Sequence, residues 1–381
     1  MIYLDYAATT PMSDVAIEVY TEVAKKYYGN SISLHNIGSV ATELLTTSRA
    51  QLAQLIGGKT EGVYFTSGGS DSNQLALESL IRGQMEKGNH IITSQIEHSS
   101  IQHFLEEKER QGFEVTYLPV DERGRVHLKD VQQAIKETTI LTTIHYGNGE
   151  LGTIQSIRDI GQLLAEHQIV FHSDCCQTFG KIPINMNELP IDSISISSPK
   201  VYGPKGVGAV YIRPDIRWAP MYPGTTHEEG FKAGTVNVPG ICAFVASAKQ
   251  VIDDMIEERH RLEQLRHYFI TRLDELPTDV VVEGCPESHL PHIMALRVKG
   301  IEGQYTMLEL NRLGIAISTG SACLVGLSDP PRVMKALGLG DREAKQYVRL
   351  STGKYTTKEE IDDTIEIFVK VLDHFFAQMR I

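Results

Sequence analysis

The sequence predicts an α/β fold with a mostly parallel sheet covered by helices on both faces. Between residues 60 and 215, short apolar runs alternate with helical patterns, an alternation typical of repeated βαβ units. The chain has 381 residues, which is too long for one compact core, so two domains are expected. Because ligands of such sheets bind beyond the carboxyl ends of the strands, the search for chemistry starts there.

Seven apolar runs are candidates for the strands of this sheet. Helix-like segments lie between several of them, such as residues 101–111, which Gly112 closes, and residues 157–167. A seven-stranded, mostly parallel sheet is therefore predicted for the large domain. The candidate strands are residues 63–66, 90–93, 115–120, 141–144, 170–174, 193–197 and 208–212.

A smaller α+β domain is predicted from the C-terminal third of the chain. A long helical pattern follows Asn237 and runs towards Leu276, with charges interleaved. Strand-like pieces at 280–283 and 292–298 come next, and then a final helix from Thr357. The long helix would bridge the two domains. The expected domains are residues 13–250 and residues 1–12 together with 251–381.

Composition and charge exclude several classes of partner. The net charge is −12 and the pI is about 5.6, so neither nucleic acid nor an anionic membrane is expected as a main partner. No apolar run approaches the roughly 18 residues of a membrane span. Residues 1–5 lack the basic and apolar regions of a signal peptide, so a cytoplasmic protein is expected. The five cysteines show no zinc-binding spacing, and no metal site is expected.

The first candidate site is the turn of residues 66–73, which joins a strand to an apolar-periodic helix. Gly68 and Gly69 allow the backbone to approach a ligand closely. Ser70 adds a hydroxyl and an N–H at a helix N-terminus, where an anion is favoured. This turn is a candidate phosphate site, and a capped helix start without a ligand is the alternative.

Two further candidates also follow apolar strands. Asp174 ends the strand at 170–174, where a cofactor's pyridinium N–H would compensate its charge; a helix N-cap is the alternative. Lys200 stands just beyond the strand at 193–197, in a Ser/Gly/Pro-rich stretch that suits a desolvated amine able to form a Schiff base, and Lys205 is its rival. Together, a phosphate turn, a strand-end Asp and a strand-end Lys indicate a pyridoxal-phosphate enzyme.

Nine ordered motifs, spread over nearly the whole chain, point to one family. They are residues 3–11, 66–73, 97–98, 150–155, 172–177, 203–208, 234–237, 318–323 and 349–353. In these motifs the sequence resembles the cysteine desulfurases of the NifS/IscS group, and most of all their Bacillus NifS branch. These proteins are fold-type I pyridoxal-phosphate enzymes, so the resemblance implies the aspartate aminotransferase-like fold.

The resemblance implies roles around the cofactor ring. Lys200 would hold pyridoxal 5′-phosphate as a Schiff base and later move the Cα proton of the substrate. His98 would stack on the ring and assist proton transfer; a buried, hydrogen-bonded histidine is the alternative. Asp174 would pair with the ring nitrogen, and Gln177 would bond the phenolic oxygen.

The resemblance also implies a phosphate site, a shared dimer and a substrate clamp. Arg349 would bind the substrate carboxylate bidentately, as a guanidinium can. The family is dimeric with shared active sites, so a homodimer is expected in which Thr235 reaches the site of the other subunit. The residues expected to bind the phosphate are Gly69, Ser70, Ser197 and Thr235.

Cys323 separates this group from aminotransferases. The small-residue stretch 318–326 predicts a loop from which its thiol reaches the substrate sulfur. The implied reaction converts L-cysteine into L-alanine and leaves a persulfide on Cys323. An acceptor protein would then take the sulfur: an iron–sulfur scaffold, a tRNA-thiolation protein or an apo-enzyme such as quinolinate synthase.

Two positions depart from the family pattern. The family has His before the Schiff-base lysine, whereas this chain has Pro199, which lacks an N–H, so weaker cofactor retention is expected. The family's Asn before Glu150 is replaced by Gly149, and the adjacent Asn148 is kept as a substrate-binding candidate. The alternatives are a selenocysteine lyase or another lyase of the same fold, and a sulfur-relay protein with weakened catalysis.

Overall fold

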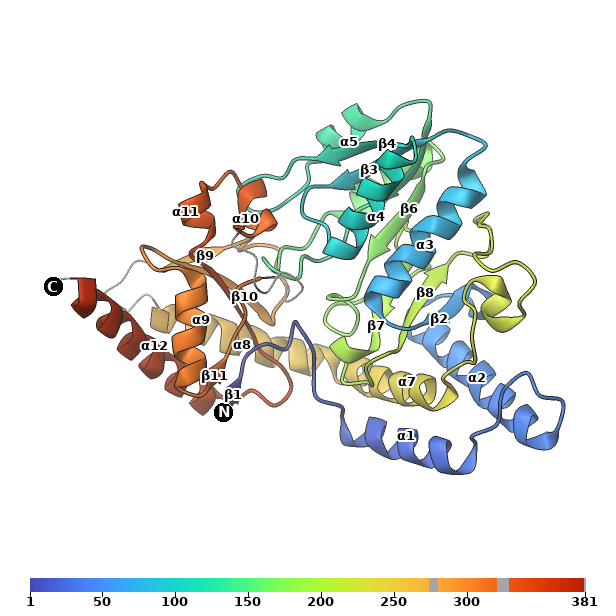
Figure 1. Cartoon of the computed structure of the whole chain (residues 1–381), viewed down its shortest axis with the longest axis horizontal. Helices are drawn as coiled ribbons and strands as arrows, with labels where there is room; N and C mark the ends of the chain where they lie inside the picture. Colours follow the sequence, from blue (N-terminus) through green and yellow to red (C-terminus); the bar gives the residue numbers. More distant parts are fainter. Residues whose placement is uncertain (274–279, 321–328, 380–381) are drawn as a thin grey trace.

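A computed structural model of the chain describes residues 1–273, 280–320 and 329–379 (Figure 1). Seven strands form its central sheet in the order β2-β8-β7-β6-β5-β3-β4. Strand β8 runs antiparallel to both neighbours, and the other pairs are parallel. The strands are β2 (Val63–Thr66), β3 (His90–Ser94), β4 (Glu114–Leu118), β5 (Thr139–Thr143), β6 (Val170–Asp174), β7 (Ser193–Ser197) and β8 (Gly208–Ile212). The mostly parallel, seven-stranded α/β fold predicted from the sequence is confirmed.

Alternate residues of the strands bury into cores on the two faces of this sheet. Phe171 and Ile194 pack in one core with residues of α2, α6 and α7. Val170 and Val210 pack in the other with residues of α3 and α4. Because both faces are covered, every residue of β2, β3, β5, β6, β7 and β8 is buried, including the serines that alternate with isoleucine in β7. The helices of this part are α1 (Asp14–Lys26), α2 (Asn36–Leu55), α3 (Gly69–Gln84), α4 (Ser99–Arg110), α5 (Leu128–Ala134), α6 (Ile157–Glu166) and α7 (Val238–Asp253).

A second, smaller body has its own sheets and its own core (left in Figure 1). Strands β9 (Val280–Glu283), β10 (Ile293–Val298) and β12 (Tyr347–Ser351) form an antiparallel sheet. Strand β1 (Ile2–Tyr3) pairs with β11 (Ile315–Ala316), so the N-terminal segment lies on this body. The domain boundaries stay a prediction. The helices here are α8 (Met255–Leu273), α9 (Gly303–Arg312), α10 (Arg332–Ala336), α11 (Asp341–Ala344) and α12 (Lys358–Met379).

The single long helix expected after Asn237 is interrupted. Helix α7 ends at Asp253 and α8 begins at Met255, with Asp254 between them. Helix α7 packs against α1 and α2, whereas α8 packs against α12. The interruption therefore falls where burial passes from the core of the large sheet to the core of the smaller body.

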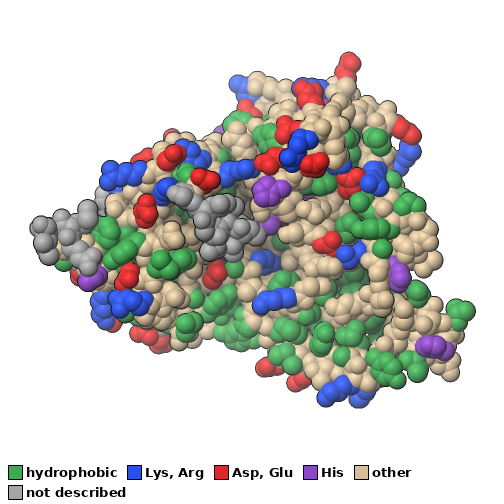
Figure 2. Space-filling view, in the orientation of Figure 1, with side chains coloured by type: hydrophobic (Ala, Val, Ile, Leu, Met, Phe, Trp, Pro, Cys, Tyr) green, Lys and Arg blue, Asp and Glu red, His purple; other side chains and the backbone are tan. Residues whose placement is uncertain are grey.

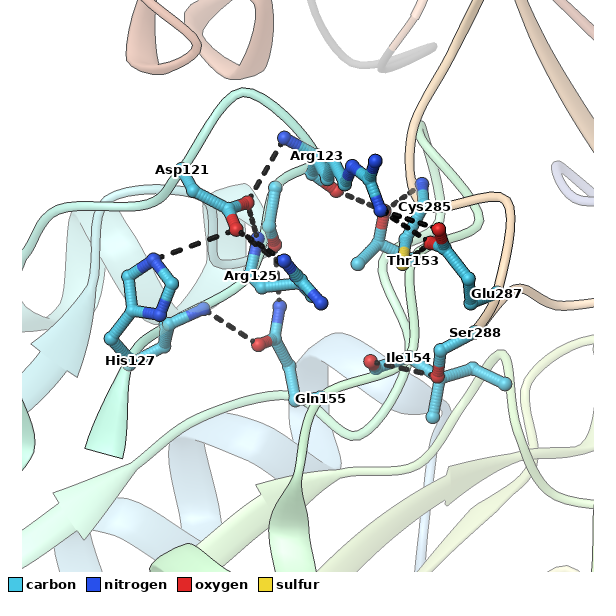
Figure 3. Close-up of polar contacts among 12 residues, drawn as sticks. Asp121, Arg123, Arg125, His127, Thr153, Ile154, Gln155, Cys285, Glu287 and Ser288 are labelled. Atoms are coloured by element: carbon cyan, nitrogen blue, oxygen red, sulfur yellow. Dashed lines mark hydrogen bonds and ion pairs between the residues drawn. The ribbon is translucent and has the colours of Figure 1, made fainter.

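Polar contacts join the two bodies beside the central sheet (Figure 3). The backbone N–H of Cys285 donates to Thr153 Oγ1 at 3.2 Å, and Ile154 N–H donates to the carbonyl of Ser288 at 3.0 Å. At the exposed rim, Arg123 Nη1 lies 2.6 Å from a carboxylate oxygen of Glu287. These contacts tie the loop before β10 to the segment after β5 and to the turn between β4 and α5.

Two features are absent from the described residues. Within residues 1–273, 280–320 and 329–379, no helix has the length and apolarity that a membrane crossing needs. The same residues contain no group of three or more His, Cys, Asp or Glu side chains placed to hold a metal ion.

Candidate active site

The candidate residues of the large sheet meet at one edge because of the strand directions. Strands β2, β6 and β7 all point the same way, so their carboxyl ends share an edge. Asp174 is the last residue of β6, and Lys200 ends a short 3₁₀ turn directly after β7. Gly68 and Gly69 follow β2 and open helix α3. Three motifs far apart in the sequence therefore line one site.

The turn after β2 leaves a cradle for an anion. Gly68 caps helix α3 with a φ of 140°, which favours glycine. A Cβ on Gly69 would lie 2.8 Å from Cys176 Sγ and 3.3 Å from Ser197 Cβ, so any side chain at Gly69 would fill this space. Ser70, in the first turn of α3, is exposed. The helix N-terminus and the free space beside Ser197 fit a phosphate group.

Asp174 is held as a carboxylate under the site. It accepts hydrogen bonds from Asn73 Nδ2 at 2.7 Å and from the backbone N–H of Cys176 at 2.8 Å. Burial alone would raise its pKa, but His98 nearby and these two donors outweigh burial and hold the pKa below its usual value. A buried anion of this kind fits the protonated ring nitrogen of a pyridine cofactor.

Lys200 is enclosed, whereas its rival Lys205 is exposed. The Lys200 ammonium donates to the carbonyl of Ala7 at 2.7 Å and to the carbonyl of Ala8. Burial lowers the pKa of Lys200, and the charge of Arg349 lowers it further. A desolvated amine with a lowered pKa suits a group that must lose its proton to react.

His98 caps helix α4 at the opening of the site. Its Nδ1 accepts the backbone N–H of Ser100 at 3.2 Å. The side chain keeps an exposed surface, and Figure 2 shows histidine and basic side chains in the depression between the two bodies. Desolvation by the surrounding protein lowers the pKa of His98. His98 is therefore mostly neutral at neutral pH.

Arg349 reaches the site from β12 of the smaller body. It is 5% exposed, its Nη2 lies 2.8 Å from Asp5 Oδ1, and its Nη1 donates to the carbonyl of Gly149 at 2.9 Å. Its Nε is buried and has no hydrogen-bond partner among the residues that the structure describes. The Nε–H of the guanidinium is thus available to an anionic ligand.

The remaining predicted residues differ in how they are placed. Gln177 Nε2 donates to the carbonyl of Ala7 at 3.0 Å, close to Gly149. The side chain of Asn148 already has hydrogen-bond partners within the chain. Its Oδ1 accepts two backbone N–H groups, and its Nδ2 donates to the carbonyl of Ile96. A substrate contact of Asn148 stays a prediction and requires exchange of one of these bonds.

The roles predicted for two residues stay predictions. Thr235 is exposed on the chain, and its contribution to a second subunit's site stays a prediction. Cys323 lies outside the described residues. Cys175 and Cys176 are buried, and burial raises the pKa of both thiols, so both fit packing better than reaction.

Sequence reasoning missed several polar partners of the site. Asp5 and Asn73 lie within the family motifs 3–11 and 66–73, but the sequence predicts no role for either of them. For Asn73, the signal was a polar side chain on the apolar face of α3. Glu97 and His145 form a buried ion pair with Oε1 and Nδ1 2.9 Å apart. Burial would lower the pKa of His145, but the Glu97 carboxylate raises it above the usual value. Only the three-dimensional arrangement reveals this pair.

Comparison with known proteins assigns the family. The model of the class-V aminotransferases matches residues 2–364. A putative cysteine desulfurase NifS of Bacillus subtilis is 45% identical over 370 residues, which cover 97% of this chain and 94% of that protein. The chain belongs to the NifS/IscS cysteine desulfurases. A cysteine desulfurase IscS of Dictyoglomus turgidum is 38% identical, over 98% of this chain and 94% of that protein.

Solved structures of this family have the same fold. A NifS-like protein superposes with a TM-score of 0.92 at 30% identity, covering 98% of this chain and 99% of the other. A second structure, SspA in complex with cysteine, superposes with a TM-score of 0.83 at 30% identity. It covers 94% of this chain and all of the other. The recognised resemblance to NifS/IscS cysteine desulfurases is confirmed.

Proposed function

We propose that this chain is a pyridoxal-phosphate-dependent cysteine desulfurase that takes sulfur from L-cysteine and releases L-alanine. The observation that carries the proposal is the enclosed amine of Lys200, which lies near the carboxylate of Asp174 and the guanidinium of Arg349. A lysine of lowered pKa, a buried anion and a buried cation are the groups that this chemistry needs. The family of the chain supports the same conclusion.

The residues at the carboxyl ends of the strands of the large sheet fit pyridoxal phosphate. Lys200 would hold it covalently, Asp174 would bond its ring nitrogen and Gln177 its phenolic oxygen. His98 would cover one face of the ring. When bound, the cofactor supplies an electron sink that weakens bonds at the substrate's Cα and Cβ. The residues proposed to hold the phosphate are Gly69, Ser70 and Ser197, with Thr235 of a second subunit.

Binding and proton transfer fall to this chain's own side chains. Arg349 would bind the substrate carboxylate through its unpartnered Nε and an adjacent Nη, which fixes the amino acid in the site. Lys200 Nζ, once deprotonated, would take the proton from the substrate Cα. The lowered pKa of Lys200 increases the fraction of free amine at neutral pH.

Cys323 is the proposed sulfur carrier. Its thiolate would form an S–S bond to the substrate sulfur while the Cβ–S bond breaks, and the Cβ carbon would take up a proton to give alanine. The products are L-alanine and a Cys323 persulfide, so atoms and electrons balance without an added oxidant or reductant. An acceptor protein would then take the outer sulfur as its own persulfide, and Cys323 would return to a thiol.

Persulfide mapping tests this function directly. After the purified chain is mixed with L-cysteine, mass spectrometry is expected to find one added sulfur, 32 Da, on the peptide that carries Cys323. Alanine should form in equal amount during the first turnover. Cys323→Ala should abolish both signals, whereas Cys285→Ala should leave them unchanged. Sulfide and alanine release that survives Cys323→Ala would point to a lyase instead.

A further inference from the structure

A continuous set of hydrogen bonds connects Asp174 with His98. Asn73 Nδ2 donates to Asp174 Oδ2 at 2.7 Å and to Ser100 Oγ at 3.1 Å. Ser100 Oγ lies 2.8 Å from His98 Nδ1. The four side chains come from α3, β6 and the start of α4. Three of them are buried, and His98 lies at the opening of the site.

The direction of each bond follows from the donors. The amide nitrogen of Asn73 carries two hydrogens, and the two contacts use both. The opposite orientation of this amide is excluded, because its oxygen would then face the Asp174 carboxylate. Ser100 Oγ therefore accepts from Asn73, and its own hydrogen is directed to His98 Nδ1.

A second donor fixes the same nitrogen of His98. The backbone N–H of Ser100 points to His98 Nδ1 at 3.2 Å, and a backbone N–H can only donate. Two donors converge on Nδ1, so Nδ1 carries no proton. A neutral imidazole then has its proton on Nε2. His98 presents Nε2–H, a donor, to whatever binds in the site.

Burial favours the neutral ring of His98. Desolvation lowers the pKa of His98, and the charges of Lys200 and His103 act in the same direction. The carboxylates of Asp174 and Glu97 oppose this effect. Because the net pKa is lowered, the doubly protonated ring is the minor form at neutral pH.

We propose that Ser100 is a positioning residue that, with Asn73, fixes the Nε2–H tautomer of His98. In this arrangement His98 acts on ligands as a hydrogen-bond donor at Nε2, rather than as the base that takes a proton there. The identity of the group that meets Nε2 rests on the proposed function. The tautomer itself does not, because it depends only on contacts within this chain.

Nitrogen NMR of histidine-labelled, full-length protein tests the proposal without an activity measurement. The ring signals of His98 are assigned as those missing from His98→Gln. The wild-type ring is expected to show a protonated Nε2 and an unprotonated Nδ1 across neutral pH. A protonated Nδ1 in the folded wild-type protein would overturn the proposal, whatever the variants do.

Variants then test the contribution of Ser100. Ser100→Ala removes one donor to the neutral ring, so the pKa of His98 should rise by about half to one pH unit. Ser100→Thr keeps the hydroxyl and should restore the wild-type pKa. Ser99→Ala, at the adjacent position, is the matched control and should change nothing. Equal pKa values in Ser100→Ala and Ser99→Ala would refute the role of Ser100.

A parallel assay separates this proposal from the proposed function. If alanine release from L-cysteine is absent while His98 shows the Nε2–H tautomer and the Ser100→Ala shift, only the proposed function fails. If alanine is released but the ring carries its proton on Nδ1, only the positioning role fails.

Discussion

Two walls of the candidate site are built in different ways. The strand-end wall consists of Gly69, His98, Asp174, Ser197 and Lys200, each of which follows or ends an element of the large sheet. The closing wall consists of Asp5, Ala7, Ala8 and Arg349, from the N-terminal segment and β12. The strand-end wall is assembled from local turns, whereas the closing wall depends on contacts between opposite ends of the chain.

The difference shows what each wall can contribute. In the strand-end wall, buried donors from the chain itself hold Asp174 in place. In the closing wall, Asp5 accepts a hydrogen bond from Arg349. The carbonyls of Ala7 and Ala8 accept hydrogen bonds from the ammonium of Lys200. We infer that the strand-end wall determines which cofactor fits, and that the closing wall adjusts the charges that meet the substrate.

The largest effect is expected at the centre of the strand-end wall. Lys200→Ala would remove both the proposed covalent attachment and the proposed proton acceptor, so kcat/KM for L-cysteine should fall by at least about 1,000-fold. Borohydride reduction of the purified enzyme should label Lys200 and no longer fix cofactor in the variant. Lys205→Ala, at the exposed rival position, is the control and should retain activity. Labelling of Lys205 instead would contradict the assignment.

A smaller effect is expected when the guanidinium of Arg349, in the closing wall, is replaced by an ammonium. Arg349→Lys keeps the charge but cannot make two parallel bonds to a carboxylate, so KM for L-cysteine should rise about 100-fold with a smaller change in kcat. Steady-state kinetics measure both constants. Arg297→Lys provides the control, since Arg297 pairs with Glu283 in the same sheet but outside the site. An unchanged KM in Arg349→Lys would remove Arg349 from substrate binding.

The ion pair of the closing wall should also stabilise the fold. Asp5→Asn leaves the buried Arg349 without its carboxylate, and the free energy of unfolding should decrease by about 2 kcal/mol. Urea denaturation of the cofactor-free chain measures this change. Asp341→Asn breaks the exposed pair with Lys335 and should cost much less, because solvent screens that pair. Equal losses in the two variants would mean that the Asp5 pair contributes no more than a surface pair.

The smallest effect concerns the point where the two walls touch. The carbonyl of Pro199 accepts both the N–H and the hydroxyl of Thr10, and a substitution at 199 leaves these bonds available. Pro199→His adds a backbone N–H and an imidazole beside Lys200, so pyridoxal phosphate should bind about tenfold tighter. A spectroscopic titration gives the dissociation constants. Pro199→Ala separates the backbone contribution from that of the ring, and equal affinity in Pro199→His would disprove the expected cofactor loss.

The strand-end wall was the part of the site that sequence could predict. Strands β2, β6, β7 and β8 have the predicted bounds, because each apolar run stops at a polar or glycine-rich turn. The lysine, the aspartate and the glycine turn stand directly after such runs. Their convergence at one edge then follows from parallel pairing alone.

The closing wall and the bonds between side chains could not be predicted in this way. The contact of Asp5 with Arg349 joins residues 344 positions apart, and no local sequence pattern predicts it. The link from Asn73 to Ser100 depends on how two helix starts face each other. The break at Asp254 has no glycine or proline signal, because it arises from packing of α7 and α8 in separate cores.

The N-terminal segment has a consequence for biosynthesis. Its bonds to Arg349 and Ser351 join residues 344 positions apart, so they cannot form before the segment around residue 350 has left the ribosome. The large sheet can fold earlier, since all its strands lie between residues 63 and 212. Contacts of such long sequence separation form late and slowly. A nascent chain can therefore form the strand-end wall well before the closing wall is complete.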